Sequence, residues 1–257
     1  MRLSSRRDRI LTPEAGVHPL IRELLDLMFP PRCQVCGDCG PEVFCPACRA
    51  RVTRISRPHC LVCGAPFDPL AQSGELCAVC RAEGRHFDFA RAVGLFETPL
   101  RELIHSFKYD GVRALARPLG ELLADYVADA GIPDLAPGDF ELICPVPLHP
   151  LRESERGFNQ AELLARVLAE RFGVPVVRAL DRVRFTEPQV LLPARARAAN
   201  VRGAFRARGD GVAGKSVLLV DDVYTTGATL SECARMLRRA GASRVYVLTL
   251  ARPHPGR

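Results

Sequence analysis

Two acidic residues, Asp221 and Asp222, follow a short apolar run and precede a turn of small and hydroxylic residues. The apolar run, Val217 to Val220, predicts a buried strand, and open α/β sheets bind ligands beyond the carboxyl ends of such strands. Neighbouring buried carboxylates repel each other unless ligand hydroxyls or a cation stabilise them. The pattern therefore predicts a polar ligand whose hydroxyl groups donate hydrogen bonds to this acidic pair.

The turn after the acidic pair has the composition of an anion-binding site. Its residues are Thr225, Thr226, Gly227, Ala228 and Thr229, and they open an expected helix. Backbone N–H groups and the helix dipole favour an anion there, and the threonine hydroxyls add further donors. Acidic pair and turn together match a sugar phosphate. The alternative is an ordinary Asp-capped turn that requires no ligand.

The whole segment from Val217 to Thr229, VLLVDDVYTTGAT, resembles the signature of type I phosphoribosyltransferases. The resemblance implies that the acidic pair holds the ribose 2- and 3-hydroxyls of phosphoribosyl diphosphate and that the turn holds its 5-phosphate. It also implies Mg²⁺, which we expect ligand and water to hold, because no further metal-ligating carboxylate stands out. Gly209 to Ser216 matches a P-loop pattern, but it leads into a strand instead of a helix, so we reject that interpretation.

A second candidate ligand segment carries Arg152 and Arg156, in a stretch that leaves a strand through three prolines and a charged loop. Arginine clamps a diphosphate through planar, charge-assisted hydrogen bonds. For either arginine alone a solvated surface position is the simpler explanation, and only their grouping favours a ligand. Residues 181–215 have weak periodicity, and a connection this long predicts a lid or a mobile loop.

These motifs, with the segment from His105 to Gly111, resemble the ComF family, phosphoribosyltransferase-like proteins linked to DNA uptake in competent bacteria. The motifs are FKYDG, PVPLHP with RGFNQA, RFTEPQ with R-x2-N, and VDDVYTTGAT followed by LTLAR. The resemblance implies phosphoribosyl diphosphate binding at the acidic pair and turn, with a diphosphate role for Arg152 and Arg156. Two functions stay open: a phosphoribosyltransferase with an unidentified acceptor, or a non-catalytic nucleotide or phosphate sensor that binds single-stranded DNA or uptake proteins.

Nine of the eleven cysteines lie between Cys33 and Cys80, and eight of them form four C-x2-C pairs. The pairs are Cys33 with Cys36, Cys45 with Cys48, Cys60 with Cys63, and Cys77 with Cys80. Two such pairs complete a tetrahedron of thiolates, which predicts two structural Zn²⁺ ions and no metal catalysis. Sequential pairing is assumed, a cross-braced arrangement is the alternative, and Cys39 offers a rival pair with Cys36. A redox C-x-x-C motif would need a thioredoxin-like context that is absent.

The elements that must position these groups divide the chain into three parts. We expect a lead-in with a short helix over 1–32, a double zinc ribbon over 33–84, and an α/β phosphoribosyltransferase-like domain over 85–257. Strands are expected over 87–96, 141–146, 174–180, 216–220 and 244–250. Helices are expected from Thr98-Pro99 through Phe107 and over 115–130, 159–172 and 228–240. Strands that alternate with helices predict a mainly parallel sheet.

Composition agrees with a globular protein, since 47% of residues are hydrophobic and 25% are charged. The sequence contains neither a secretory signal pattern nor an apolar run long enough for a membrane span. Cysteine spacing typical of metal ligation suggests reduced thiols, so we expect a cytoplasmic protein. Residues 151–208 hold twelve Arg against six Asp or Glu, which indicates phosphate or nucleic-acid partners or else a solvated face.

Overall fold

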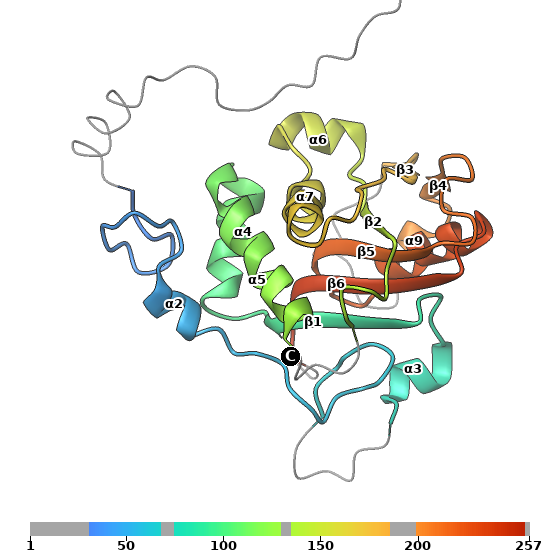
Figure 1. Cartoon of the computed structure of the whole chain (residues 1–257), viewed down its shortest axis with the longest axis horizontal. Coiled ribbons are helices and arrows are strands. Elements are labelled where there is room, and N and C mark those ends of the chain that lie inside the picture. Colours follow the sequence, from blue (N-terminus) through green and yellow to red (C-terminus); the bar gives the residue numbers. More distant parts are fainter. Residues whose placement is uncertain (1–30, 68–74, 130–134, 186–198, 255–257) are drawn as a thin grey trace, which may run out of the picture.

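A four-stranded parallel sheet forms the centre of the computed structural model, which describes residues 31–67, 75–129, 135–185 and 199–254. Its strands are β1 (Phe89–Leu95), β2 (Leu142–Pro145), β5 (Ser216–Val223) and β6 (Arg244–Arg252), in the order β1-β6-β5-β2 (Figure 1). All three neighbouring pairs are parallel. The prediction of a mainly parallel α/β sheet is confirmed.

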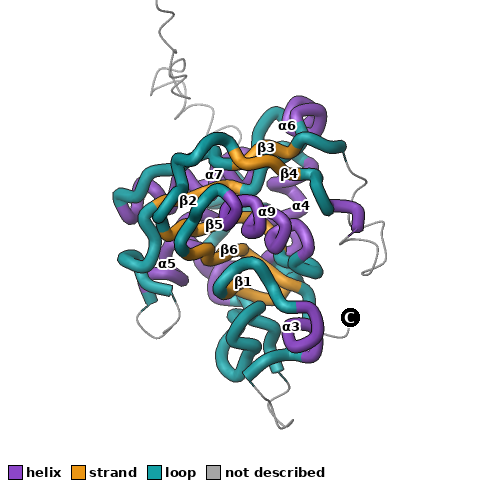
Figure 2. The backbone as a smooth tube through the Cα atoms, turned by 90° about the vertical axis from the view of Figure 1, so that its right-hand side faces the viewer, coloured by secondary structure: helices purple, strands orange, loops and turns teal. Residues whose placement is uncertain are grey.

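Helices cover both faces of this sheet because side chains along each strand alternate between the faces. Leu218 and Val220 of β5 share one apolar cluster with the helices α4 (Leu100–Tyr109), α5 (Ala116–Ala128) and α7 (Gln160–Phe172). The intervening Val217 and Leu219 face α9 (Ala228–Arg239) on the other side of the sheet. A short 3₁₀ turn, η1 (Arg113–Leu115), precedes α5. Figure 2 shows the strands as layers in the order β2, β5, β6, β1 from top to bottom.

The charged loop expected around Arg152 and Arg156 is instead a helix, α6 (Pro150–Arg156). His149 caps it by accepting a hydrogen bond from the backbone N–H of Leu151 at its Nδ1, 3.3 Å away, and Gly157 ends it in the left-handed conformation. Proline suits the first position of a helix, where its missing N–H has no partner to lose. Pro150 therefore marks the start of a helix, whereas Pro145 ends β2, and the loop prediction is wrong.

The strand expected over 174–180 is also wrong for most of its length. Only Val176 forms a bridge, with Ile143 of β2, before the chain turns away to β3 (Leu180–Arg182). β3 pairs antiparallel with β4 (Phe205–Ala207) in a separate two-stranded sheet. Parts of the predicted lid are thus ordered strands. Residues 186–198 lie outside the described residues, as does the short helix expected in the lead-in.

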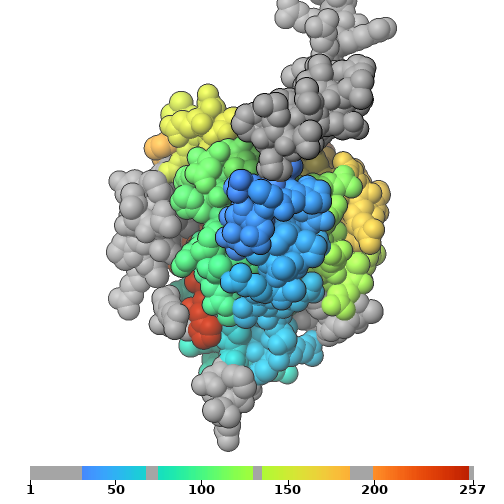
Figure 3. All heavy atoms as spheres, turned by 90° about the vertical axis from the view of Figure 1, so that its left-hand side faces the viewer, coloured from blue at the N-terminus to red at the C-terminus, as the bar shows by residue number. Residues whose placement is uncertain are grey.

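The cysteine-rich module, with the short helices α2 (Pro46–Ala50) and α3 (Ala78–Glu83), lies along β1. Backbone hydrogen bonds join the two, among them Leu95 N–H to Thr53 O at 2.9 Å and Ala90 N–H to Val62 O at 2.7 Å. Figure 3 shows this blue and cyan module packed against the green part of the chain. Because the module shares apolar clusters with the α/β part, the boundary near Gly84 stays a prediction.

None of the helices in the described parts of the chain has the length and hydrophobicity that crossing a membrane requires.

Candidate functional site

The acidic pair lies within strand β5, which continues to Val223 and not only to Val220 as predicted. Successive side chains of a strand point to opposite faces, so the two carboxylates leave the sheet on different sides. Asp222 lies on the side of α4, and Asp221 lies on the side of α9 and β3. The two groups therefore have different neighbours and different electrostatic environments.

Asp222 forms an ion pair with Lys108 at the end of α4, with 2.7 Å between Nζ and Oδ1. The two side chains are only 19% and 11% exposed. An ammonium group this close to a carboxylate attracts it electrostatically, and limited contact with water strengthens the attraction. Lys108 is thus the positively charged partner of Asp222 at the site.

Asp221 has a different environment, because burial and the charge of Asp222 raise its pKa to about 7. Lys108 and Arg182 act against this rise, as does the backbone N–H of Asp222, which donates to Asp221 Oδ1 at 2.9 Å. Asp221 is consequently a carboxyl group that changes charge near neutral pH. A ligand hydroxyl or a cation would favour its ionised form.

The turn after β5 is tightly constrained at Gly227, which has a φ of +78° and occupies the N-cap position of α9. Ala228 N–H is 3.4 Å from the hydroxyl oxygen of Thr226, and Ser231 N–H donates to Gly227 O at 2.8 Å. The first N–H groups of a helix lack partners within the helix. The arrangement can therefore hold an anion where the sequence places one.

A cavity of about 740 Å³ brings the acidic pair, the turn and several cations together. Its walls come from the ends of α4 and β2, from α6 and the start of α7, from β3, and from β5 with its turn. Lining residues include Lys108, Arg152, Arg156, Asn159, Arg182, Phe185, Asp221, Asp222, Thr225, Gly227 and Thr229. Among the residues of the turn, Thr226 and Ala228 do not line this cavity.

Both arginines predicted to contact a diphosphate lie on one side of α6, four residues apart, and each covers an aromatic ring. Arg152 lies 5.2 Å from the ring centroid of Phe185, and Arg156 lies 5.2 Å from that of Tyr109. Arg182 of β3 adds a third guanidinium, and burial with the nearby charge of Arg152 lowers its pKa. Arg182 escaped the sequence interpretation because the expected strand stopped at Leu180.

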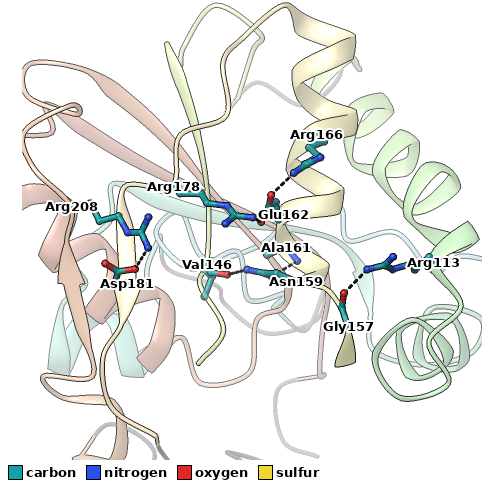
Figure 4. Close-up of polar contacts among 10 residues, drawn as sticks. All are labelled: Arg113, Val146, Gly157, Asn159, Ala161, Glu162, Arg166, Arg178, Asp181 and Arg208. Carbon is teal, nitrogen blue, oxygen red and sulfur yellow. Dashed lines mark hydrogen bonds and ion pairs between the residues drawn. The ribbon is translucent and has the colours of Figure 1, made fainter. Parts of the chain in front are cut away.

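Hydrogen bonds fix the segment between β2 and α7 that forms one wall of the cavity (Figure 4). Asn159 is buried, its Nδ2 donates to Val146 O at 3.0 Å, and its Oδ1 accepts from Ala161 N–H at 3.0 Å. Arg113 donates to the carbonyl of Gly157, at the junction of α6 and α7. The arginines of α6 are therefore presented from a rigid support.

The eight paired cysteines form two groups of four. Within each group, all sulfur atoms lie within 4.8 Å of one another. One group holds Cys33, Cys36, Cys45 and Cys48, and the other holds Cys60, Cys63, Cys77 and Cys80. The pairs therefore combine sequentially and are not cross-braced, and Cys39 belongs to neither group. Burial opposes thiolate formation at Cys33 and Cys60, but backbone N–H donors outweigh it and lower their pKa values to about 6 and about 7. Each group fits one tetrahedral Zn²⁺ ion.

Comparison with known proteins gives matches to both parts of the chain. Residues 24–82 match the family model for a double zinc ribbon domain, and residues 156–257 match the one for a phosphoribosyl transferase domain. Competence protein F of Haemophilus influenzae is 34% identical over 218 residues, which cover 81% of this chain and 90% of that protein.

Two further relatives agree over a similar length. The DNA utilization protein YhgH of Escherichia coli K12 is 34% identical over 81% of this chain and 90% of its own length. Competence protein ComFC of Bacillus subtilis is 30% identical over 82% of this chain and 85% of its own length. Since these relatives are 30% to 34% identical over 81% to 82% of the chain, the chain belongs to the ComF family, and its α/β part is a phosphoribosyltransferase-like domain.

Proposed function

We propose that the cavity at the carboxyl ends of β2 and β5 binds phosphoribosyl diphosphate together with Mg²⁺. The observation that carries the proposal is the meeting of three complementary groups in one cavity: an acidic pair, a turn at the N-terminus of a helix, and three arginines. Hydroxyl groups, a monophosphate and a diphosphate are the parts of the ligand that such groups recognise.

Each part of the site has one role in this proposal. Asp221 and Asp222 accept hydrogen bonds from the ribose 2- and 3-hydroxyls, and the turn from Thr225 to Thr229 holds the 5-phosphate. Arg152 and Arg156 face the diphosphate. Mg²⁺ keeps several waters and binds through one or two carboxylates and phosphate oxygens, so ligand and water supply most of its coordination.

The cavity also fits a transfer reaction. The bond between ribose C1 and the diphosphate oxygen breaks, the diphosphate leaves with the electron pair, and a nucleophile of the acceptor forms the new bond to C1. Arg152 and Arg156 would stabilise the leaving diphosphate, and a Mg²⁺ ion bound with the ligand would add positive charge there, so positioning and electrostatics would supply the catalysis without a covalent nucleophile of the protein. We propose phosphoribosyl transfer on this ground, with an acceptor that the sequence does not identify.

Calorimetric titration with phosphoribosyl diphosphate and Mg²⁺ tests the ligand. The double variant Asp221→Asn with Asp222→Asn should bind at least about tenfold more weakly than the wild type, since two charge-assisted hydrogen-bond acceptors are lost. Asp181→Asn is the matched control, because Asp181 pairs with Arg208 and does not line the cavity (Figure 4). Equal affinity of wild type and double variant would remove the site assignment. Product analysis after incubation with candidate bases and nucleic acid then tests transfer.

We further propose that the two cysteine groups hold structural Zn²⁺ ions. Four thiolates leave no open coordination position, so the ions would stabilise the module and take no part in chemistry. Thiolates that remain reduced for metal binding also favour a cytoplasmic protein.

A second candidate function is a phosphate or nucleotide sensor that contacts single-stranded DNA. The names of the relatives, competence and DNA utilization proteins, favour it, as does the excess of arginine over acidic residues between 151 and 208. Affinity for a labelled single strand should fall steeply as salt rises. The absence of measurable binding near physiological salt would remove this candidate.

A further inference from the structure

The turn of the proposed phosphate site has a second cavity behind it, of about 970 Å³. This cavity lies between the turn and the second cysteine group, and Thr225 lines both cavities. Its walls include Cys63, Cys77, Arg85, Tyr224, Thr226, Ala228 and Arg252. The turn is therefore the wall that separates the candidate ligand site from the second cysteine group.

A chain of direct contacts crosses this region. The guanidinium of Arg252, at the end of β6, donates a hydrogen bond to the carbonyl of Cys63 and lies 4.7 Å from the ring centroid of Tyr224. Arg252 and Tyr224 are only 7% and 3% exposed. A cation over an aromatic face is a stabilising contact, and it gains strength when both groups are removed from water. Cys63 is thus connected to Tyr224 through one side chain.

Tyr224 packs directly against the backbone of the turn from Thr225 to Thr229. A Cβ atom on Gly227 would lie 2.2 Å from the Tyr224 hydroxyl oxygen, so the phenol occupies the space directly behind this glycine. The backbone N–H of Tyr224 donates to Ala251 O at 2.9 Å, and its ring meets the edge of Phe87. Since packed side chains transmit small displacements, the place of the ring sets the place of the turn.

Electrostatic attraction links the position of Arg252 to the metal state of the second cysteine group. Four thiolates around one Zn²⁺ carry net negative charge, and Arg252 approaches this group through the carbonyl of Cys63. Loss of the ion would release the sulfurs of Cys60 and Cys63 and so change the conformation of the turn from Cys60 to Gly64, in which Gly64 N–H donates to Cys60 O at 2.8 Å. The carbonyl of Cys63, which accepts the hydrogen bond from Arg252, would then move.

The first cysteine group has no such connection. Its residues Cys33 and Cys48 pack in the apolar cluster of α4 and α5, and Arg49 of α2 pairs with Asp125 of α5 at 2.7 Å. None of its four cysteines lines either of the cavities described for this part of the chain. The two groups therefore differ in what they can affect.

We propose that Arg252 and Tyr224 are positioning residues through which the second cysteine group, but not the first, sets the affinity of the turn for a 5-phosphate. The proposal rests on the proposed function, because it assumes that the turn holds that phosphate. It predicts that the metal state of the second cysteine group controls ligand binding at a site that contains no metal-bound cysteine.

The first test uses Arg252→Gln in the full chain with zinc bound, and calorimetry with two probes, ribose 5-phosphate and inorganic diphosphate with Mg²⁺. Affinity for ribose 5-phosphate should fall about fivefold to tenfold, the effect of one lost charged contact of about 1 kcal/mol or slightly more. Affinity for diphosphate should stay within about twofold, because Arg152 and Arg156 are untouched. Arg235→Gln is the matched control, since Arg235 lines the same cavity but pairs with Glu232.

Parallel loss of both probes would indicate general destabilisation and overturn the proposal, as would unchanged binding of ribose 5-phosphate. If the wild type binds neither probe, the proposed function fails and this inference fails with it. If the wild type binds both and Arg252→Gln equals it, only the inference fails.

The second test compares Cys77→Ser with Cys45→Ser, one ligand position from each group, after metal analysis of both variants. Each should lose about one equivalent of zinc, but only Cys77→Ser should bind ribose 5-phosphate about tenfold more weakly or worse. Equal effects of the two changes would overturn the proposal. Should Cys77→Ser fail to fold, the Arg252→Gln measurement decides by itself.

Discussion

Replacement of Asp221 by asparagine should stabilise the protein, and the gain should grow as the pH rises. Burial and Asp222 raise the Asp221 pKa from its model-peptide value of 3.8 to about 7 in the folded chain. The unfolded chain releases the proton near the lower value, so folding is penalised increasingly as the pH rises from about 4 through 7. At 1.36 kcal/mol per pKa unit, the penalty reaches about 4 kcal/mol above neutral pH.

Most of that penalty is already present at pH 6, where the folded carboxyl group is still largely protonated and the unfolded one is not. Between pH 6 and pH 8 the penalty grows by about 1 kcal/mol more. Asparagine carries no charge and keeps an oxygen that can accept from the N–H of Asp222. The stability difference between Asp221→Asn and wild type should therefore increase by about 1 kcal/mol over this interval.

Urea unfolding followed by circular dichroism at pH 6, 7 and 8, without chelator, measures this difference. Asp181→Asn serves as control, because Arg208 holds the pKa of Asp181 below its usual range and the group stays ionised throughout. Its effect on stability should not change with pH. A constant or shrinking advantage of Asp221→Asn from pH 6 to pH 8 would refute the assigned environment of this carboxyl group.

Three further outcomes are expected. Lys108→Met should destabilise the chain by about 2 kcal/mol, since it leaves Asp222 partly buried without its cation, and Lys108→Arg should recover part of this in the same unfolding assay. Gly227→Ala should cost more than about 1 kcal/mol, from its φ of +78° and the clash with Tyr224, and should weaken ribose 5-phosphate binding in calorimetry. Metal analysis should give two zinc equivalents per chain for wild type and for Cys39→Ser. A lower zinc content of Cys39→Ser would contradict the exclusion of Cys39 from both cysteine groups.

Local patterns predicted the secondary structure around the acidic pair and the pairing of the cysteines. The apolar run from Val217 to Val220 forms a buried parallel strand. Gly227 has a positive φ and lies against Tyr224, where a Cβ atom would not fit. The four C-x2-C pairs likewise needed only local geometry to bring each pair of sulfurs together. These features depend on neighbours in sequence, which is why the sequence was sufficient.

Groups brought in from distant elements were harder to foresee. Lys108 reaches Asp222 only because α4 lies on the face of the sheet to which the second carboxylate points, and β5 had been expected to end before that residue. Arg182 enters the cavity from a two-stranded sheet whose pairing joins residues about 25 apart, which leaves no periodic signal in either short strand. The proline-rich start of α6 was misread because proline ends some elements and begins others.

The backbone contacts between the cysteine module and β1 have a consequence for solution behaviour. β1 is an outer strand of the sheet, and unpaired outer strands are templates for pairing with another chain. The N–H groups of Ile55, Ala90 and Leu95 occupy that strand border through bonds to Val93, Val62 and Thr53. The cysteine-rich module thus covers the outer edge of β1, and a chain trimmed to its α/β part would expose that edge for pairing with another chain.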